Sequence, residues 1–213
     1  MVLYKYINPK WADEMTSRGS VRIGTLYGFR TTETLGGERG DQHEGVRISL
    51  TDGKAGFIRG EDLPWFVKES LRVPDGVVMK FDEGGHFLVH QHAPNVFVFC
   101  ACSRYDANLM KLFGGACIEI TEPRFYFDAI TKALEGWTPE GVRRITGFQL
   151  APCQYLPREQ TWPNVVPYNP IFRKAPAYEH QMETRAVWWT PLTLIEPENL
   201  LVPEIRHFCR RIA

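Results

Sequence analysis

The stretch FLVHQHAPNVFVFCAC, residues 87–102, is the part of the sequence that decides the fold class. It contains two segments with strand character, Phe87–His92 and Val96–Cys102, separated by a turn at Pro94-Asn95. A third such segment, Val77–Phe81, comes before them and is followed by a glycine pair. We therefore expect the middle of the chain to form an antiparallel meander.

Similar patterns predict the elements on either side of this stretch. Asn8-Pro9 is a typical helix start and Gly19 a typical helix end, so a helix should span residues 9–18 and pack through Trp11 and Met15. The other expected elements are strands over Val2–Ile7, Val21–Thr25, Ala116–Ile120 and Glu183–Trp189 and near Leu200, a hairpin at Asp52-Gly53, and helices over Asp106–Phe113, from Pro123 to about Trp137, and from Pro203.

Two segments are expected to lack long regular elements. Thr31–Gly45 is rich in glycine and acidic residues and predicts a long loop of the kind that often serves function. Six prolines between residues 151 and 180 exclude a long helix or a central strand there, so this segment should wrap the surface. Together these patterns predict an α+β fold with a largely antiparallel sheet and a few short helices, as a single domain over residues 1–213.

Composition excludes several classes of protein. The 25 Lys and Arg residues balance the 25 Asp and Glu residues, so the chain lacks the strong basic footprint of many nucleic-acid-binding proteins. The five cysteines show no repeated spacing, which favours a cytoplasmic protein over a secreted disulfide framework. No export signal or membrane-spanning run is evident, and the phosphate-loop, Rossmann, nucleophile-elbow and zinc-protease motifs are missing.

Histidine and cysteine side chains gather around the central turn. His90 and His92 share one face of their expected strand, and Cys100 and Cys102 share one face of the next. A hairpin at Pro94-Asn95 would bring the two pairs together as zinc requires. Buried core cysteines and solvated histidines explain the same residues more simply, so we expect no metal.

Two clusters of charged residues stand out. Asp41, His43 and Glu44 lie close together in the long loop, and Glu183 and Arg185 share one face of a strand, with Gln181 extending the row. Both patterns are typical of exposed surface. They also suit a cleft, in which a carboxylate beside arginine stays ionised and can stabilise a cationic transition state.

Several short motifs occur in an order that resembles an uncharacterised bacterial domain family often found near phage-defence genes. Members of that family run KYR, D..EG, a Cys/Phe-Ser strand, an MW..Y helix and a YExExR strand. This chain departs from the pattern at Lys111 and Phe113, and at Gln181-Met182-Glu183. The matching residues are Leu3–Tyr6, Gly40-Asp41, Glu44-Gly45, Phe99–Ser103, Leu109-Met110, Phe113-Gly114, Phe172–Lys174, Tyr178, Glu179, Glu183 and Arg185.

The Gln181-x-Glu183 pattern also resembles the [QE]xE element of ADP-ribosyltransferases. That resemblance implies an enzyme that uses NAD to modify a protein or nucleic-acid acceptor, in bacteria–phage conflict. Glu183 would stabilise the ribosyl cation, Gln181 would orient the acceptor, and Glu44 with Asp41 would order the long loop. Cofactor contacts would come from Arg30 or Arg22 at the pyrophosphate, from Tyr27, from Tyr4 or Tyr6, and from Arg185.

Two alternatives remain open at this stage. A non-catalytic binding module, a defence sensor or inhibitor, would recognise a phage or host protein through aromatic residues such as Trp162, Tyr168 and Phe172. A metal-dependent hydrolase would use His86, His90 and His92. The enzyme and the binding module differ in whether NAD binds and is consumed.

Overall fold

Strand β7 (Phe97–Cys102) is the centre of the main sheet. In the computed structural model, which describes residues 1–30, 41, 43–136 and 141–213, β13 (Glu183–Trp189) pairs with β7 along its whole length. Because a strand has two edges, β1 (Leu3–Ile7) and β2 (Ser20–Thr25) share the other edge. All of these pairings are antiparallel, which confirms the expected α+β fold with a largely antiparallel sheet.

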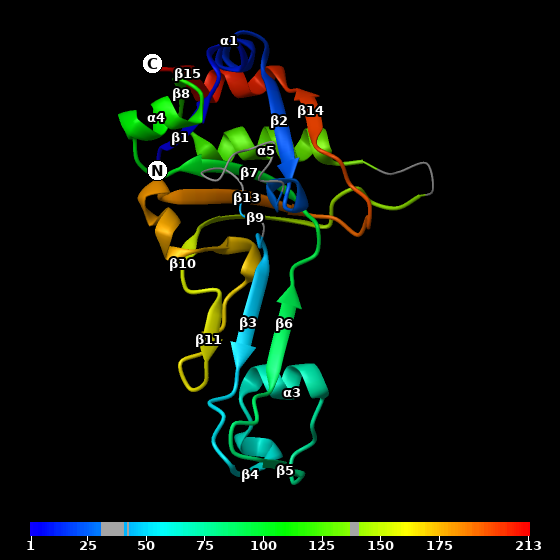
Figure 1. Ribbon diagram of the computed structural model, residues 1–213. Coiled ribbons are helices and arrows are strands. Elements are labelled where there is room, and N and C mark those ends of the chain that lie inside the picture. The colour runs from blue at the N-terminus through cyan, green and yellow to red at the C-terminus, as the bar shows by residue number, and fades with distance from the viewer. Residues whose placement is uncertain (31–40, 42, 137–140) are drawn as a thin grey trace.

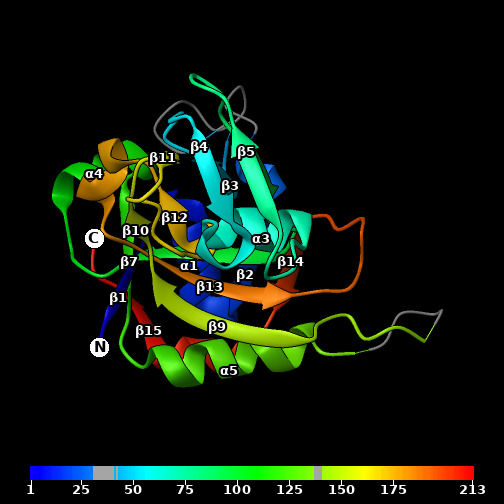
Figure 2. The same cartoon turned by 90° about the horizontal axis from the view of Figure 1, so that it is seen from below.

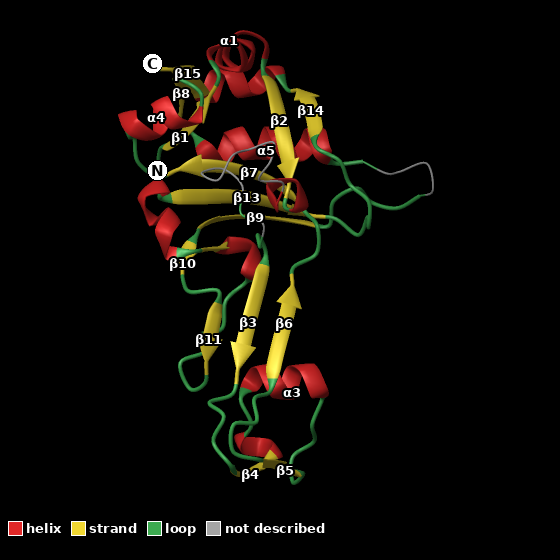
Figure 3. Ribbon diagram, viewed as in Figure 1, coloured by secondary structure: helices red, strands yellow, loops and turns green. Residues whose placement is uncertain are grey.

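Four further strands extend this sheet. β8 (Ala116–Ile120) pairs with β1, and β15 (Cys209–Arg211) pairs with β8. At the other edges of the sheet, β14 (Glu198–Leu201) pairs with β2, and β9 (Gly147–Pro152) pairs with β13. Figure 3 shows these strands with short helices around them, so segments from both ends of the chain meet in one sheet.

The main sheet is split where β1 and β2 meet β7. β1 pairs with β7 only at Tyr4–Cys102, and β2 pairs with β7 only at Gly24–Val98 and Thr25–Phe97. Cys100 lies between these two contacts, and its carbonyl oxygen accepts a hydrogen bond from Lys5 Nζ at 2.7 Å. The two strands diverge toward α1 (Pro9–Arg18), which joins their far ends (Figure 1). The result is a V-shaped opening beside the central strand.

Helix α1 forms as its sequence predicts. The Asn8 side chain accepts a hydrogen bond from the Lys10 amide, and Gly19 ends the helix in the left-handed conformation at φ 76°. Met15 is buried as expected, but Trp11 is 57% exposed and Ala12 is buried instead. The helix therefore packs through Ala12 and Met15, and Trp11 stays at the rim of the split.

The other predicted helices cover the main sheet. α4 (Ala107–Phe113) begins at the capping side chain of Asp106, and α5 (Pro123–Leu134) lies on one face of the sheet beside β9 and β13 (Figure 2). The core beneath α5 is aromatic and aliphatic, and includes Phe99, Tyr126 and Trp188. Trp137, at the expected end of α5, lies outside the described residues.

A smaller lobe projects from the opposite face (Figures 1 and 2). In it β3 (Val46–Leu50) pairs with β6 (Leu88–His92) and, in parallel, with β11 (Glu159–Thr161). The tip contains α3 (Trp65–Leu71), the 3-10 turn η2 (Gly60–Asp62), and the pair β4 (Gly56–Arg59) and β5 (Val78–Phe81). The expectation of one domain over residues 1–213 stays a prediction.

Two expected strand pairings are wrong. β6 and β7 do not form a hairpin, because β6 pairs with β3 while β7 belongs to the main sheet. Asp52-Gly53 does not form the turn of a hairpin either, because β4 pairs with β5 rather than with β3. Turn residues mark where a strand ends, but they do not specify its partner. Most of the expected long loop, residues 31–40 and 42, lies outside the described residues.

The proline-rich segment contains no long helix, as expected, but it does not simply wrap the surface. Its short elements are β10 (Gln154–Tyr155), β12 (Arg173–Lys174) and the 3-10 turns η3 (Pro170–Phe172) and η4 (Pro176–Gln181). Residues from Ile171 to Lys174 are buried. This segment therefore supplies side chains to the interior between the two lobes.

The end of the chain also differs in detail from the expectation. Residues Pro203–Phe208 form the 3-10 helix η5 rather than an α-helix, and β15 follows it. None of the helices in the described ranges has the length and apolar character that a bilayer crossing requires.

We predict that Gly19→Ala lowers the free energy of unfolding by about 2–4 kcal/mol, from left-handed strain plus overpacking. A Cβ on Gly19 would lie 2.8 Å from the Cα atom of Pro203 and closer still to the Val202 carbonyl. Gly141 has the same φ of 76°, and no atom of the described residues lies within 4 Å of its added Cβ, so Gly141→Ala is the matched control. Urea unfolding of both variants measures the difference, and equal losses would show that the contact with Val202 is unimportant.

Candidate functional site

A cavity of about 880 Å³ occupies the split of the main sheet. One wall comes from β1, another from β2, and Trp11 of α1 lies at the rim. Strand β7 and a group of charged residues behind it complete the lining. The volume lies within the ordinary range for sites that bind organic ligands. The aromatic and polar lining residues include Tyr4, Lys5, Tyr6, Trp11, Arg22, Glu44, Lys174, Gln181, Glu183 and Arg185.

Glu183 is held by two buried cations. Arg185 Nε donates to Glu183 Oε1 at 2.6 Å, and Lys174 Nζ donates to Glu183 Oε2, also at 2.6 Å. Lys174 Nζ also donates to the side-chain oxygen of Gln181 at 2.6 Å. All four side chains are more than nine-tenths buried. The row, which suited either an exposed strand face or a cleft, is therefore an internal network.

Glu44 attaches a second segment of the chain to this network. Its carboxylate accepts from Arg185 Nη1 at 2.8 Å, and Arg185 Nη1 also donates to the Ile171 carbonyl. Arg30 Nε donates to the Glu44 carbonyl at 2.9 Å. Arg185 thus joins the main sheet, the start of the small lobe and the proline-rich segment.

Charge pairing keeps both partners of the Lys174–Glu183 pair ionised. Burial by itself raises the pKa of Glu183, but Arg185 and Lys174 outweigh it and hold the pKa well below its ordinary value. Burial lowers the pKa of Lys174, but Glu183 outweighs that effect and raises the pKa above its ordinary value. Glu183 is therefore an anion at neutral pH.

Neutral groups complete the surroundings of Glu183. The Glu183 amide donates to the Tyr155 hydroxyl at 2.6 Å, and Cys153 Sγ lies 3.8 Å from Glu183 Oε1. Burial raises the pKa of the Cys100 and Cys102 thiols to about 12. At neutral pH these cysteines are therefore thiols rather than nucleophilic thiolates.

The β2 wall offers an uncommitted cation. Ser20, Arg22 and Gly24 line the cavity, while Val21 and Ile23 between them point into the core. The Arg22 guanidinium is exposed and forms no hydrogen bond or ion pair with another described residue. Of the charged side chains that line the cavity, four are basic and two are acidic, which favours an anionic ligand.

Tyr4 and Tyr6 form the aromatic part of the β1 wall. The Tyr6 hydroxyl donates to the Arg104 carbonyl at 3.1 Å and accepts from the Asp106 amide at 2.6 Å. These bonds fix the ring against the start of α4, so that Tyr6 presents its ring rather than its hydroxyl to a ligand.

The structure brings five of the eight predicted site residues together. Glu183, Gln181, Glu44, Tyr6 and Arg185 all line the cavity. Arg30, Tyr27 and Asp41 are not among its lining residues. The Arg30 guanidinium stacks on the Tyr27 ring at 3.8 Å, and Asp41 pairs with Arg158 at 3.0 Å. Arg22, offered as the alternative to Arg30, is the early arginine that lies in the cavity.

Lys174 is the residue that sequence reasoning missed. It lies on the two-residue strand β12 inside a segment expected at the surface, so neither periodicity nor a catalytic spacing marks it. The signal that was available is its place in the Phe172–Lys174 element of the family resemblance.

The hairpin that zinc binding would require does not form. His90 and His92 lie on β6, Cys100 and Cys102 lie on β7, and these strands belong to different sheets. In the described part of the chain, no group of three or more His, Cys, Asp or Glu side chains is placed to hold a metal ion.

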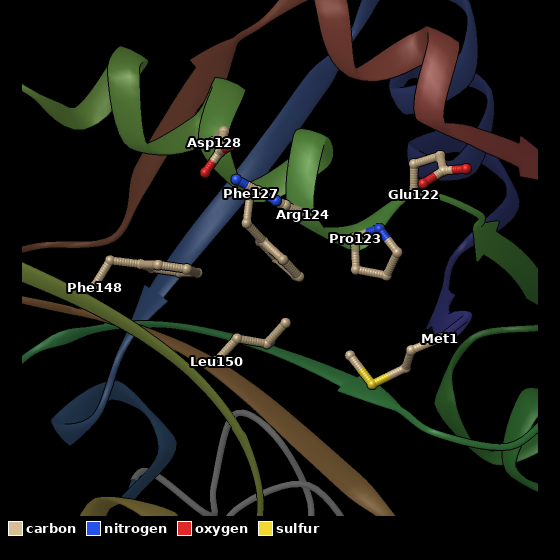
Figure 4. A pocket seen from close by; sticks show the side chains of 8 residues that line it. All are labelled: Met1, Glu122, Pro123, Arg124, Phe127, Asp128, Phe148 and Leu150. Atoms are coloured by element: carbon tan, nitrogen blue, oxygen red, sulfur yellow. The ribbon is translucent and has the colours of Figure 1, made fainter.

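A second, smaller cavity of about 380 Å³ lies between α5 and β9. Figure 4 shows that Met1, Phe127, Phe148 and Leu150 point toward one another within it, beside Pro123. Its charged residues, Glu122, Arg124 and Asp128, belong to the start of α5. Buried charges of the kind that surround Glu183 are missing from this lining, so we take the split cavity as the candidate site.

The chain matches no family model, no curated protein and no solved structure.

We predict that Glu183 contributes stability that is lost in acid. Its folded-state pKa is lowered from an ordinary value of 4.5, so its contribution is complete above about pH 4.5 and declines as pH falls toward the folded pKa. Below pH 4.5 the unfolding free energy of the wild type should fall more steeply than that of Glu183→Gln, by up to about 1.4 kcal/mol per pH unit. Urea unfolding between pH 3 and 7 measures this. An unfolding free energy that falls equally steeply in both proteins below pH 4.5 would contradict the prediction.

We also predict that the cysteines of the native protein react slowly with a thiol reagent. Burial raises the pKa of all five thiols, to about 11 for Cys117 and Cys209 and about 12 for Cys100 and Cys102, and well above 9 for Cys153. Titration with Ellman's reagent at pH 8 should show five rapid equivalents in guanidinium chloride and none without it. A thiol that reacts rapidly in the native protein would contradict the prediction that burial protects all five cysteines.

Proposed function

We propose that this chain is an ADP-ribosyltransferase-like enzyme that binds NAD in the split of the main sheet. The observation that carries the proposal is that the anionic Glu183, Gln181 and the uncommitted Arg22 line one cavity. Gln181 and Glu183 come from the neighbouring elements η4 and β13, whereas Arg22 comes from β2, far away in the sequence. The acceptor would be a protein or a nucleic acid.

The cavity fits the chemical parts of NAD. Arg22, together with Lys5, provides positive charge for a pyrophosphate. Tyr4, Tyr6 and Trp11 provide aromatic surface for flat rings. Bound NAD would supply a glycosidic bond whose cleavage leaves positive charge on the ribosyl carbon.

Each buried residue then has a defined task. Glu183 holds a fixed negative charge at the cavity wall, where it stabilises a developing cation. Lys174 and Arg185 fix both of its oxygens, so the carboxylate needs no reorganisation when charge develops. Glu44 fixes Arg185 in turn, which makes Glu44 a positioning residue rather than a catalytic one.

We expect NAD to raise the melting temperature of the wild type by about 5–10 °C at one hundred times its dissociation constant. Arg22→Gln should lose this shift, because it removes the uncommitted cation. Glu183→Gln should keep the shift but release nicotinamide about 100-fold more slowly. Differential scanning fluorimetry and a nicotinamide assay measure the two effects, and circular dichroism shows whether each variant folds.

Arg124→Gln is the matched control for Arg22→Gln. It removes the same charge from the lining of the second cavity, which shares no lining residue with the split cavity. Its NAD shift should equal that of the wild type. A wild-type protein without an NAD shift, or a Glu183→Gln protein that consumes NAD at the wild-type rate, would refute the proposal.

The non-catalytic binding module is the second candidate, and one specific observation favours it. Both oxygens of Glu183 already accept hydrogen bonds from Arg185 and Lys174, as in a purely structural ion pair. This module would recognise a phage or host protein, and a wild-type protein whose melting temperature NAD does not raise would favour it. Of the aromatic residues first suggested for the interface, Phe172 is buried. Trp162, which packs against the core of the small lobe, and Tyr168, which lies against Arg47, are only partly buried.

A further inference from the structure

Buried hydrogen-bonding groups without partners gather at one place in the small lobe. Six buried side-chain nitrogen or oxygen atoms have no hydrogen-bond partner in the described part of the chain. Five of them belong to Arg47, Ser49, Trp65, Arg158 and Tyr168, and the sixth to Arg30. Buried polar groups are normally paired, so five such atoms together require a specific explanation.

The other four of these residues lie around Arg47 on β3. Its guanidinium carbon lies 4.4 Å from the centre of the Trp65 ring and 5.3 Å from that of the Tyr168 ring. Ser49 is two residues further along the same strand, so it shares the face of Arg47. Arg158 directly precedes β11, beside Arg47 in the parallel register.

The unpaired atoms can all donate hydrogen bonds. They are Nε of Arg47, Nε of Arg158, the indole nitrogen of Trp65 and the hydroxyls of Ser49 and Tyr168. Arg173, buried on β12, adds a third guanidinium within electrostatic range of Arg158 and Tyr168. Three carboxylates act on the group: Asp41, which pairs with Arg158, Glu69, which acts on Arg47, and Glu44, which acts on Arg173. Glu44 already pairs with Arg185 at 2.8 Å. Two carboxylates therefore remain for three guanidiniums, which leaves an excess of positive charge.

We propose that this cluster, Arg47, Ser49, Arg158, Tyr168 and Arg173, binds a phosphate-type oxyanion. A tetrahedral oxyanion offers several acceptor oxygens and negative charge, which is what unpaired donors around three guanidiniums require. Arg47 is 4% exposed and Ser49 is 1% exposed, so these donors cannot reach bulk water directly. The site is distinct from the split cavity, whose lining includes none of these residues.

The partly exposed edge of the cluster provides the entry. The Arg158 side chain is 25% exposed, and Tyr168 is also only partly buried. The Asp41 carboxylate already lies on the Arg158 guanidinium at this edge, at 3.0 and 3.3 Å, so a carboxylate group occupies the approach that an oxyanion would use.

The test uses inorganic phosphate as the probe and the whole chain as the protein. We expect saturable stabilisation by phosphate above that given by sodium chloride at equal ionic strength, and a measurable dissociation constant by calorimetry. Tyr168→Phe removes one unpaired donor without changing the charge, and Arg158→Gln removes one cation. Each should raise the dissociation constant about tenfold, the equivalent of one charge-assisted hydrogen bond.

Two control variants separate this site from other basic positions. Arg210→Gln breaks an exposed ion pair with Glu119 on the main sheet, and Arg124→Gln removes a cation from the lining of the second cavity. Phosphate affinity should be unchanged in both. Adding AMP in parallel distinguishes a site for the free anion from one for a phosphate monoester.

Three results would overturn the proposal. They are stabilisation by phosphate no greater than by chloride, wild-type affinity in both Tyr168→Phe and Arg158→Gln, and loss of affinity in a control variant alone. Because Tyr168→Phe leaves the buried charges in place, it tests the site even where Arg158→Gln lowers stability. Failure here leaves the NAD proposal standing, since that proposal depends on Arg22 and Glu183.

Discussion

The ion network centred on Arg185 is the interaction on which the rest of this structure depends. Its guanidinium contacts Glu183 on the main sheet, Glu44 at the start of the small lobe and the Ile171 carbonyl in the proline-rich segment. Three segments, one of which lies more than a hundred residues from the other two, therefore converge on one buried side chain. Removing one member of a buried pair leaves an uncompensated charge, so these segments are held in place together rather than one by one.

The split of the main sheet follows from how two strands share one edge of β7. Because β1 and β2 are joined by the ten-residue helix α1, their far ends are held apart while their near ends both touch β7. The Cys100 carbonyl, which pairs with neither β1 nor β2, accepts a hydrogen bond from the Lys5 side chain instead. The opening thus exposes the central strand to a ligand while its hydrogen bonding is preserved, and the Arg185 network supplies charge directly behind it.

Local sequence patterns predicted the elements well and their partners poorly. Asn8, Gly19, Asp106 and Pro123 mark helix ends through interactions within a few residues, so α1, α4 and α5 could be placed. Which strand pairs with β6 depends on contacts across the whole chain, and the expected hairpins were wrong for that reason. At the site, Gln181 and Glu183 were found through a short motif, whereas Lys174 lies on a strand too short to show any period.

Strand β12 also limits how this sequence can change. Arg173 and Lys174 are its two residues, and they contact different surroundings: Lys174 meets Glu183 and Gln181, while Arg173 Nε donates to the Leu156 carbonyl. Adjacent residues of a strand face opposite ways, so inserting or deleting one residue just before Arg173 would exchange the surroundings of the two cations. A single-residue insertion or deletion directly before Arg173 should therefore not be tolerated.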